Sequence, residues 1–129
     1  DETVPEEVAT AFADAWFNYD LTRAQRFATP ESRGWIEFAA SNVSQQTIDV
    51  LNQRDEDQLT KASVMGSDVV DDSTVVARIR VENVLEYDSI GQAGTIHDAE
   101  DYALTVVNRD GKWMVRMEGL PRNEKHSRD

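Results

Sequence analysis

The chain has 129 residues, with 25 acidic and 13 basic side chains and a formal net charge of −12. This length suits one domain that buries a sizeable core without metal or disulfide support. Such an acidic surface repels a phosphate backbone over most approaches, so nucleic acid is not an expected partner. The sequence contains no cysteine, which excludes disulfides, thiol nucleophiles and thiolate metal sites. It also contains no apolar run long enough to span a bilayer.

The first half of the chain predicts short helices that begin at recognisable caps. The first helix is expected over about residues 4–18, because Thr3 and Glu6 are spaced as a capping box before an apolar stripe. Asp20 is the expected N-cap of a short second helix. The stripe of the first helix consists of Val8, Phe12, Ala15, Trp16 and Tyr19.

A third and a fourth helix are expected further along. Thr29-Pro30-Glu31 has the order of cap, proline and acid that opens a helix. Ser44 is expected to cap a further turn or two through Leu51. The polar run 52–58 then predicts a solvated connector. The residues expected on the buried side of the third helix are Trp35, Phe38 and Ala39.

The stretch from Thr74 to Asp88 predicts one long strand with a single apolar face. Apolar and polar side chains alternate there with the period of two that places neighbours on opposite faces of a strand. A strand of fifteen residues is long, so we expect it to be bent or strongly twisted. The residues expected on the buried face are Val75, Ala77, Ile79, Val81, Asn83, Leu85 and Tyr87.

Further strands are expected on either side of this one, at about residues 62–70 and 95–108. Asp71-Asp72-Ser73 allows a turn of two or three residues, and the two choices bury opposite faces of the earlier strand. Asp110-Gly111 is a strong hairpin signal that predicts a final strand. Pairing across that turn places Val106 opposite Val115, Asn108 opposite Trp113 and Leu104 opposite Met117, so that apolar residues share one face.

This order of elements predicts an α+β domain. We expect N-terminal helices packed on the concave face of a curved, four-stranded antiparallel sheet in meander order. Helices in that position leave a conical cavity at the open end of the sheet. One domain is expected over residues 1–129, with an ordered core at about 4–119 and a charged tail at 120–129.

Four stretches of the chain carry a family resemblance. They resemble the cone-shaped, cystatin-like fold of the nuclear-transport-factor-two-like superfamily, and within it the small secreted bacterial lipoproteins of unknown function. The stretches are Val8-Ala9-x-x-Phe12-x-x-Ala15-Trp16, Tyr19-Asp20, Phe27-Ala28-Thr29-Pro30-Glu31 and Gly111-Lys112-Trp113-Met114-Val115.

The resemblance implies a pocket between the helices and the concave sheet, but no catalytic residue. It also implies frequent dimerisation through the outer sheet face and a periplasmic or cell-surface location. The polar start Asp1-Glu2-Thr3 fits a chain trimmed of a leader, although an artificially shortened chain would look the same. Any lipid anchor would lie outside this chain, because the sequence contains no cysteine.

The apolar face of the long strand is interrupted by an amide at Asn83. A buried amide needs hydrogen-bond partners, and if Val81 pairs with Tyr102, then Asn83 lies opposite Glu100. Such a group would suit a small ligand that offers a donor to the carboxylate. The alternatives are a β-bulge near Asn83 that takes up the amide, or a Glu100 that lies in water near the end of its strand. The candidate ligand-binding residues are Asn83, Glu100, Tyr87, Tyr102, Tyr19, Trp16 and Trp35, of which the last three have a place in the core as their alternative.

The opposite face of the strand is charged. Arg78 and Arg80, together with Arg116, could bind an anion or form ion pairs across the strands. The segment from His97 to Asp101 looks like a metal cluster, but zinc needs three or four converging ligands, so no metal is expected. A dimer interface is an alternative use of this face, through Val76, Val84, Ala103, Val107 and Met114.

Three hypotheses for function follow. The leading one is a non-enzymatic cell-envelope domain that binds a small, partly apolar ligand in its cone. The second is a protein-interaction module that forms a homodimer or docks a partner through the outer sheet face. The third is an isomerase- or dehydratase-type enzyme with Glu100 as base, since the superfamily includes such enzymes. The sequence contains no phosphate-binding glycine loop, H-E-x-x-H element or nucleophile with a paired base, so no cofactor is expected.

Overall fold

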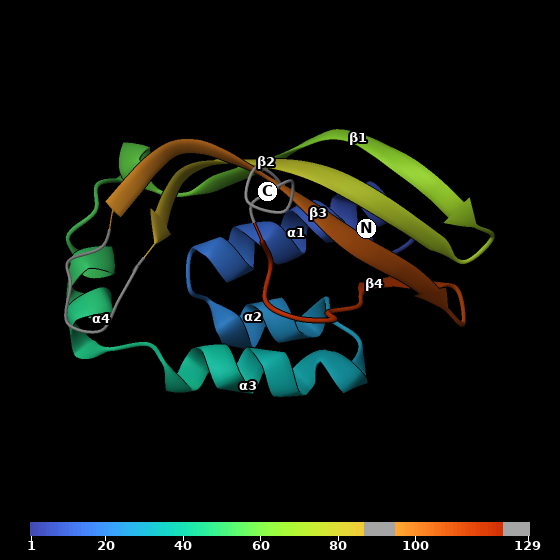
Figure 1. The fold of residues 1–129 in the computed structure, drawn as a ribbon, viewed down its shortest axis with the longest axis horizontal. Helices are drawn as coiled ribbons and strands as arrows, with labels where there is room; N and C mark the ends of the chain where they lie inside the picture. Colours follow the sequence, from blue (N-terminus) through green and yellow to red (C-terminus); the bar gives the residue numbers. More distant parts are fainter. Residues whose placement is uncertain (87–94, 123–129) are drawn as a thin grey trace.

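The helices and the strands form separate layers in the computed structural model, which describes residues 1–86 and 95–122 (Figure 1). The strands form one antiparallel sheet in the order β1-β2-β3-β4. The predicted α+β class and meander order are therefore confirmed. The helices are α1 (Pro5–Phe17), α2 (Leu21–Arg26), α3 (Arg33–Ser41) and α4 (Gln45–Asn52), with short 3-10 turns at Pro30–Ser32 and Glu56–Gln58. The strands are β1 (Lys61–Asp71), β2 (Thr74–Glu86), β3 (Thr95–Arg109) and β4 (Lys112–Val115).

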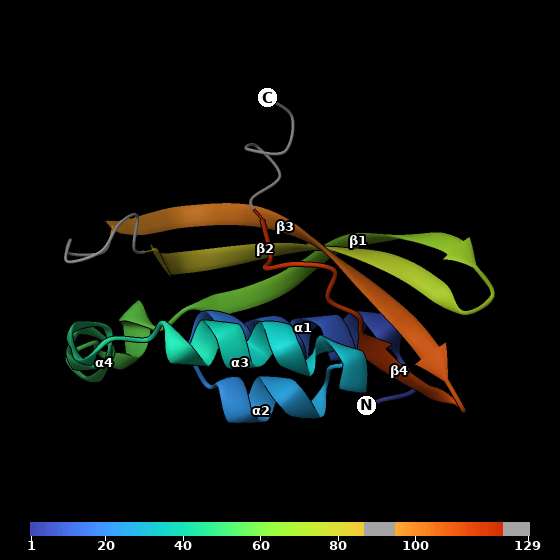
Figure 2. The same cartoon turned by 60° about the horizontal axis from the view of Figure 1, so that its bottom comes forward.

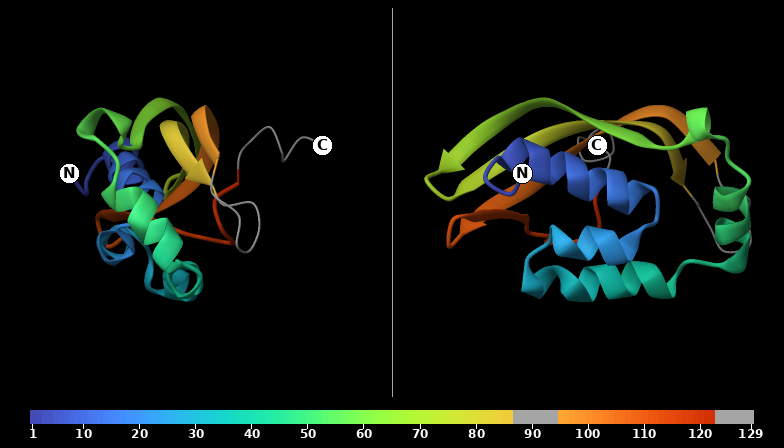
Figure 3. Two further views of the ribbon diagram at one scale, coloured as in Figure 1. Left: turned by 90° about the vertical axis from the view of Figure 1, so that its left-hand side faces the viewer. Right: turned by 180° about the vertical axis from the view of Figure 1, so that it is seen from behind.

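The sheet bends over the helices, and α1 packs directly on its concave face (Figure 2). Contacts of α1 reach all four strands. The odd-numbered residues of β2 from Val75 to Val81 are buried beneath it, as the alternation predicted. At one end of the sheet, where β2 ends and β3 begins, α4 lies beside the strands (Figure 3). The buried side chains that α1 contributes are Val8, Ala9, Phe12, Ala13, Ala15 and Phe17.

The hairpin between β3 and β4 has the predicted register. Val106 pairs with Val115 and Asn108 pairs with Trp113. Asp110 and Gly111 have φ values of 56° and 87°, the positive values that a two-residue hairpin turn requires at both positions. The expected pairing of Leu104 with Met117 is not formed, because the chain leaves the sheet after Val115.

The ends of several elements test the turn and the caps that the sequence predicted. Asp71 pairs with Thr74, so the turn between β1 and β2 has two residues. Asp20 caps α2 by accepting a hydrogen bond from the Arg23 N–H at 3.2 Å, as predicted. Ser44 caps α4 in the same way. The capping box predicted for α1 is absent, because Thr3 donates its hydroxyl to Asp1 and Val4 becomes the N-cap.

The buried side of α3 differs from the prediction. Trp35 is 40% exposed and Phe38 is 54% exposed, whereas Ile36 is only 3% exposed. The reason lies one turn earlier, where the buried Ser32 accepts a hydrogen bond from the Met117 N–H at 2.8 Å. This contact turns Ser32 toward the core, and Ile36, four residues further on, shares its face of the helix. Trp35 and Phe38 therefore point to solvent.

An ion pair joins the 3-10 turn that precedes α3 to the end of β3. Arg109 donates two hydrogen bonds to Glu31, one of them at 2.6 Å between Nη1 and Oε1. These hydrogen bonds lower the pKa of Glu31 from 4.5 to about 2. Because the lowered pKa favours the carboxylate in the folded chain, the contact stabilises the fold above pH 4.5 and is lost as the pH falls toward 2.

A Glu31→Gln variant should therefore unfold at lower urea concentration than the unaltered protein at neutral pH. The difference between the two midpoints should shrink as the pH is lowered from 4.5 toward about 3, because the carboxyl group of the unfolded chain then binds a proton while that of the folded chain stays ionised. Glu37→Gln, at an exposed position of α3, serves as the matched control and should show no such trend. A midpoint difference for Glu31→Gln that stays constant with pH would show that the ion pair contributes nothing.

Candidate functional site

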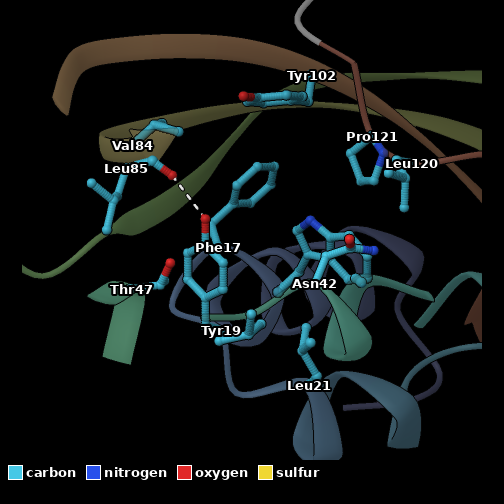
Figure 4. A pocket seen from close by; sticks show the side chains of 13 residues that line it. Phe17, Tyr19, Leu21, Asn42, Thr47, Val84, Leu85, Tyr102, Leu120 and Pro121 are labelled. Carbon is cyan, nitrogen blue, oxygen red and sulfur yellow. Dashed lines mark hydrogen bonds between the residues drawn. The ribbon is translucent and has the colours of Figure 1, made fainter. Parts of the chain in front are cut away.

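A cavity of about 400 Å³ lies between the helical layer and the concave side of the sheet (Figure 4). Its walls come from the end of α1, the start of α2, the α3–α4 connection, β2, β3 and the segment after β4. Aromatic and aliphatic side chains form most of these walls. The described residues that line it are Trp16, Phe17, Tyr19, Leu21, Ala39, Asn42, Val43, Thr47, Val84, Leu85, Tyr102, Leu120 and Pro121.

The C-terminal end of α1 forms one wall of the cavity. The Asp20 N–H donates to the Ala15 carbonyl at 2.8 Å and the Tyr19 N–H donates to the Trp16 carbonyl at 3.0 Å. These are the two bonds of a Schellman motif, in which the residue after the cap takes a left-handed conformation. Tyr19 occupies that position with a φ of 62°, where glycine is usual. A side chain with a Cβ costs roughly 1–2 kcal/mol in this conformation.

Tyr19 links the helical layer to the sheet across the cavity. Its hydroxyl donates to the Leu85 carbonyl of β2 at 3.1 Å, and Figure 4 shows this bond as a dashed line. The ring of Phe17 lies close by and packs on the ring of Tyr102 with centroids 4.5 Å apart. The left-handed turn at Tyr19 therefore orients an aromatic side chain as part of the cavity wall. The sequence predicted Tyr19 as a candidate ligand-binding residue but not its left-handed backbone or its hydrogen bond to β2.

Asn83 takes a different place from the one predicted. It has a φ of 59°, and its amide donates to the carbonyls of Asp57 and Leu59 at 3.4 and 3.3 Å. The backbone carbonyl of Asn83 accepts a hydrogen bond from the Thr60 hydroxyl at 2.8 Å. The amide is therefore bound to the turn that precedes β1 and is not part of the described cavity wall. The β-bulge expected as the alternative is not formed between β2 and β3, because Glu82 pairs with Ala99 and Val84 pairs with His97 in one unbroken register. The left-handed backbone of Asn83 and the carbonyl groups before β1 take up the amide instead.

The predicted register around Asn83 was wrong by two residues. Val81 pairs with Glu100, and Tyr102 pairs with Ile79. The length of the loop between β2 and β3 sets this register, and residues 87–94 of that loop lie outside the described part of the chain. Asn83 therefore does not face Glu100.

The kink at Asn83 changes which side chains of β2 face inward. Val84 was expected on the outer face, but it is 1% exposed and lines the cavity. Leu85, the next residue, is also buried and lines the cavity. A left-handed residue breaks the period of two, because the chain turns away from the extended conformation on which that alternation depends. Two consecutive residues therefore contribute to one wall.

The candidate residues thus divide into three groups. Trp16, Tyr19 and Tyr102 line the cavity. Asn83, Glu100 and Trp35 are not among the described residues that line it, and Trp35 lies exposed on α3. Tyr87 lies outside the described residues.

No protein family, curated protein or solved structure matches this chain.

Several residues of the cavity wall were not predicted. Leu120 and Pro121 were assigned to the charged tail, although they are the apolar residues at its start. That apolar pair was the available signal. Asn42 lies in the α3–α4 connection, where the sequence predicted a break between helices, and Thr47 lies in the predicted fourth helix; neither pattern gave a reason to place them beside a sheet.

A polar cluster joins the end of α1 to the connector that precedes β1. The side chain of Asn18 donates to the carbonyls of Asp14 and Thr60 at 2.7 and 2.9 Å. Its side-chain oxygen accepts from the Thr60 N–H at 3.1 Å and from Arg54 at 3.2 Å. Arg54 also donates to the Thr60 hydroxyl at 3.1 Å, and burial lowers the pKa of its guanidinium. The connector that was expected to be merely solvated is therefore tied to the end of α1.

The outer face of the sheet carries ion pairs between neighbouring strands. Arg80 pairs with Asp101 through two hydrogen bonds of 2.9 and 3.2 Å, and Arg78 lies 3.5 Å from Asp68. These contacts agree with the expectation of cross-strand ion pairs. Val84 and Val107 are buried within the chain. They therefore do not contribute to the exposed apolar area that was expected to form a dimer interface on this face.

In residues 1–86 and 95–122, no three His, Cys, Asp or Glu side chains come together as metal ligands would. Over the same ranges, each helix is too short or too polar to cross a membrane.

Proposed function

We propose that this protein binds a small, partly apolar ligand in the cavity between its helices and its sheet. The observation that carries the proposal is the cavity itself, about 400 Å³ of space with aromatic and aliphatic walls and a few polar groups. Binding sites for small molecules have this size and this mixture of many apolar and few polar groups. The polar groups come from Tyr19, Asn42, Thr47 and Tyr102.

The proposal includes a fold family and a location. The antiparallel meander bent over N-terminal helices supports a cone of the nuclear-transport-factor-two-like kind. The periplasmic or cell-surface location is proposed with it, on the resemblance of the sequence to small secreted lipoproteins.

A binding function is favoured over an isomerase or dehydratase. Such an enzyme needs a general base within hydrogen-bond reach of its substrate. Glu100, the candidate base, is not among the described residues that line the cavity, and those residues include no carboxylate or histidine. The described walls therefore provide contacts for a ligand but no group suited to abstract a proton at neutral pH.

Filling the cavity from α3 tests the proposal. Ala39 lines the cavity, so Ala39→Trp should place an indole ring in the space that a ligand would occupy. We expect the unaltered protein to increase the fluorescence of Nile red, an uncharged apolar dye, and the variant to bind the dye at least about tenfold more weakly. A fluorescence titration gives both dissociation constants.

Ala40→Trp is the matched control for this experiment. Ala40 is the next residue of α3, is exposed and does not line the cavity. The same substitution there should leave the affinity for Nile red unchanged. Equal affinities for the dye in all three proteins would place binding outside the cavity and contradict the proposed function.

A further inference from the structure

We infer that the ligand of this cavity is an uncharged ring compound that carries a hydroxyl or amide group, an inference that rests on the proposed binding function. Its basis is the absence of any charged side chain among the described residues that line the cavity. Acidic and basic residues make up 29% of the chain, so thirteen wall positions without one stand out. A charged ligand would find no counter-ion in these walls.

Two charged side chains near the end of α1, Asp20 and Arg54, are engaged elsewhere. Asp20 lies between Tyr19 and Leu21, which both line the cavity, but its carboxylate accepts the Arg23 N–H and caps α2. Arg54 lies in the polar cluster at the end of α1, where its guanidinium donates to Asn18 and Thr60. Neither side chain therefore contributes a charge to the described wall.

An anionic ligand is disfavoured twice. The net charge of −12 repels it during approach, and no guanidinium or ammonium group of the described wall would replace its water. Salt screens the repulsion between the anion and the net charge of the protein, but it does not reduce the cost of removing water from the anion inside the cavity. The two contributions can therefore be separated by experiment.

A cationic ligand would be attracted by the net charge, and aromatic faces can hold cations. Three of the four aromatic rings among the described lining residues already pack on another ring, however. Phe17 packs on Tyr102 at 4.5 Å, and Trp16 stacks on Phe12 with centroids 5.7 Å apart and planes inclined by 19°. A cation would lose its hydration without gaining a carboxylate or an open cage of aromatic faces. The walls thus favour an uncharged ligand over either ion.

The hydroxyl or amide of the ligand is inferred from Asn42 and Thr47. Asn42 uses one N–H to donate to the Phe38 carbonyl at 2.8 Å, which leaves its side-chain oxygen and a second N–H without a partner in the described residues. The Thr47 hydroxyl lies 3.1 Å from the Ser44 hydroxyl and can form one further bond. A ring compound with one donor and acceptor group would complete these contacts while its rings meet the apolar walls.

Three probes of nearly equal size test the inference: naphthylmethanol, naphthoate and naphthylmethylammonium. Calorimetric titration of the unaltered protein should show the alcohol binding at least about tenfold more tightly than either ion. The preference over naphthoate should persist at about 1 M salt, where repulsion at a distance is screened and only the walls discriminate. Binding of the alcohol should be lost in Ala39→Trp and kept in Ala40→Trp.

The outcomes separate the two proposals. If either ion binds as tightly as the alcohol and Ala39→Trp abolishes its binding, the cavity binds ligands but the inference about charge is wrong. If the preference over naphthoate disappears at high salt, the net charge rather than the walls selects the ligand, and the inference is again wrong. If no probe shows binding that depends on Ala39, the proposed function fails as well.

Discussion

Replacing Phe12 with alanine should lower the free energy of unfolding by about 3–5 kcal/mol. Phe12 is 0% exposed and lies in the middle of α1, the helix that packs on all four strands. It contacts the buried core and stacks on Trp16, so its removal leaves a cavity that the fixed sheet cannot close. The loss is a large share of the 5–15 kcal/mol that typically stabilises a domain. Urea unfolding followed by circular dichroism measures it.

Phe38→Ala is the matched control for Phe12→Ala. Phe38 is the same residue type on a helix but is 54% exposed on α3. The substitution there should change the free energy of unfolding by no more than about 0.5 kcal/mol. Equal losses at the two positions would mean that α1 is not the helix that holds the sheet.

The second large loss in the free energy of unfolding is expected when Asn18 is replaced by alanine. Its side chain joins α1, the connector and the start of β1 through four hydrogen bonds of 2.7–3.2 Å. Asn18→Ala leaves the Thr60 N–H and carbonyl and the guanidinium of Arg54 without these partners. Buried groups left unpaired cost about 1–3 kcal/mol each, so we expect a loss of about 3 kcal/mol after some entry of water. Urea unfolding measures the loss, and amide hydrogen exchange at Thr60 shows whether it is local.

Asn52→Ala is the control for Asn18→Ala. Asn52 is the last residue of α4, so both asparagines lie at the end of a helix, but Asn52 is exposed. The free energy of unfolding should change by less than about 0.5 kcal/mol in this variant. A loss below about 1 kcal/mol for Asn18→Ala would show that water replaces the side chain and that the cluster does not hold the connector.

The binding experiments depend on these two stability tests for their design. Ala39→Trp and Ala40→Trp leave Phe12 and the Asn18 cluster intact, so both variants should keep the bend of the sheet. A weaker affinity in Ala39→Trp can then be attributed to the filled cavity. Circular dichroism of the two variants should be the same, which confirms that comparison.

Local sequence determined much of this fold. The alternation from Val75 to Val81 predicted the buried face of β2, and Asp110-Gly111 predicted the final hairpin with its register. Asp20 and Ser44 predicted where α2 and α4 begin. Each of these features depends on hydrogen bonds or side-chain periods within a few residues, so the neighbouring sequence contains the necessary information.

Tertiary contacts decided the rotation of α3 and the walls of the cavity. Ile36 faces the core because Ser32 binds the backbone of Met117, 85 positions away. Val84 faces the cavity because Asn83 adopts a left-handed conformation and binds carbonyl groups 24 and 26 residues earlier in the chain. Contacts between residues so far apart in the sequence form only when the elements have packed. They therefore cannot be predicted from the residues on either side of each position. The sequence alone therefore determined which elements form, whereas packing determined which side chains surround the cavity.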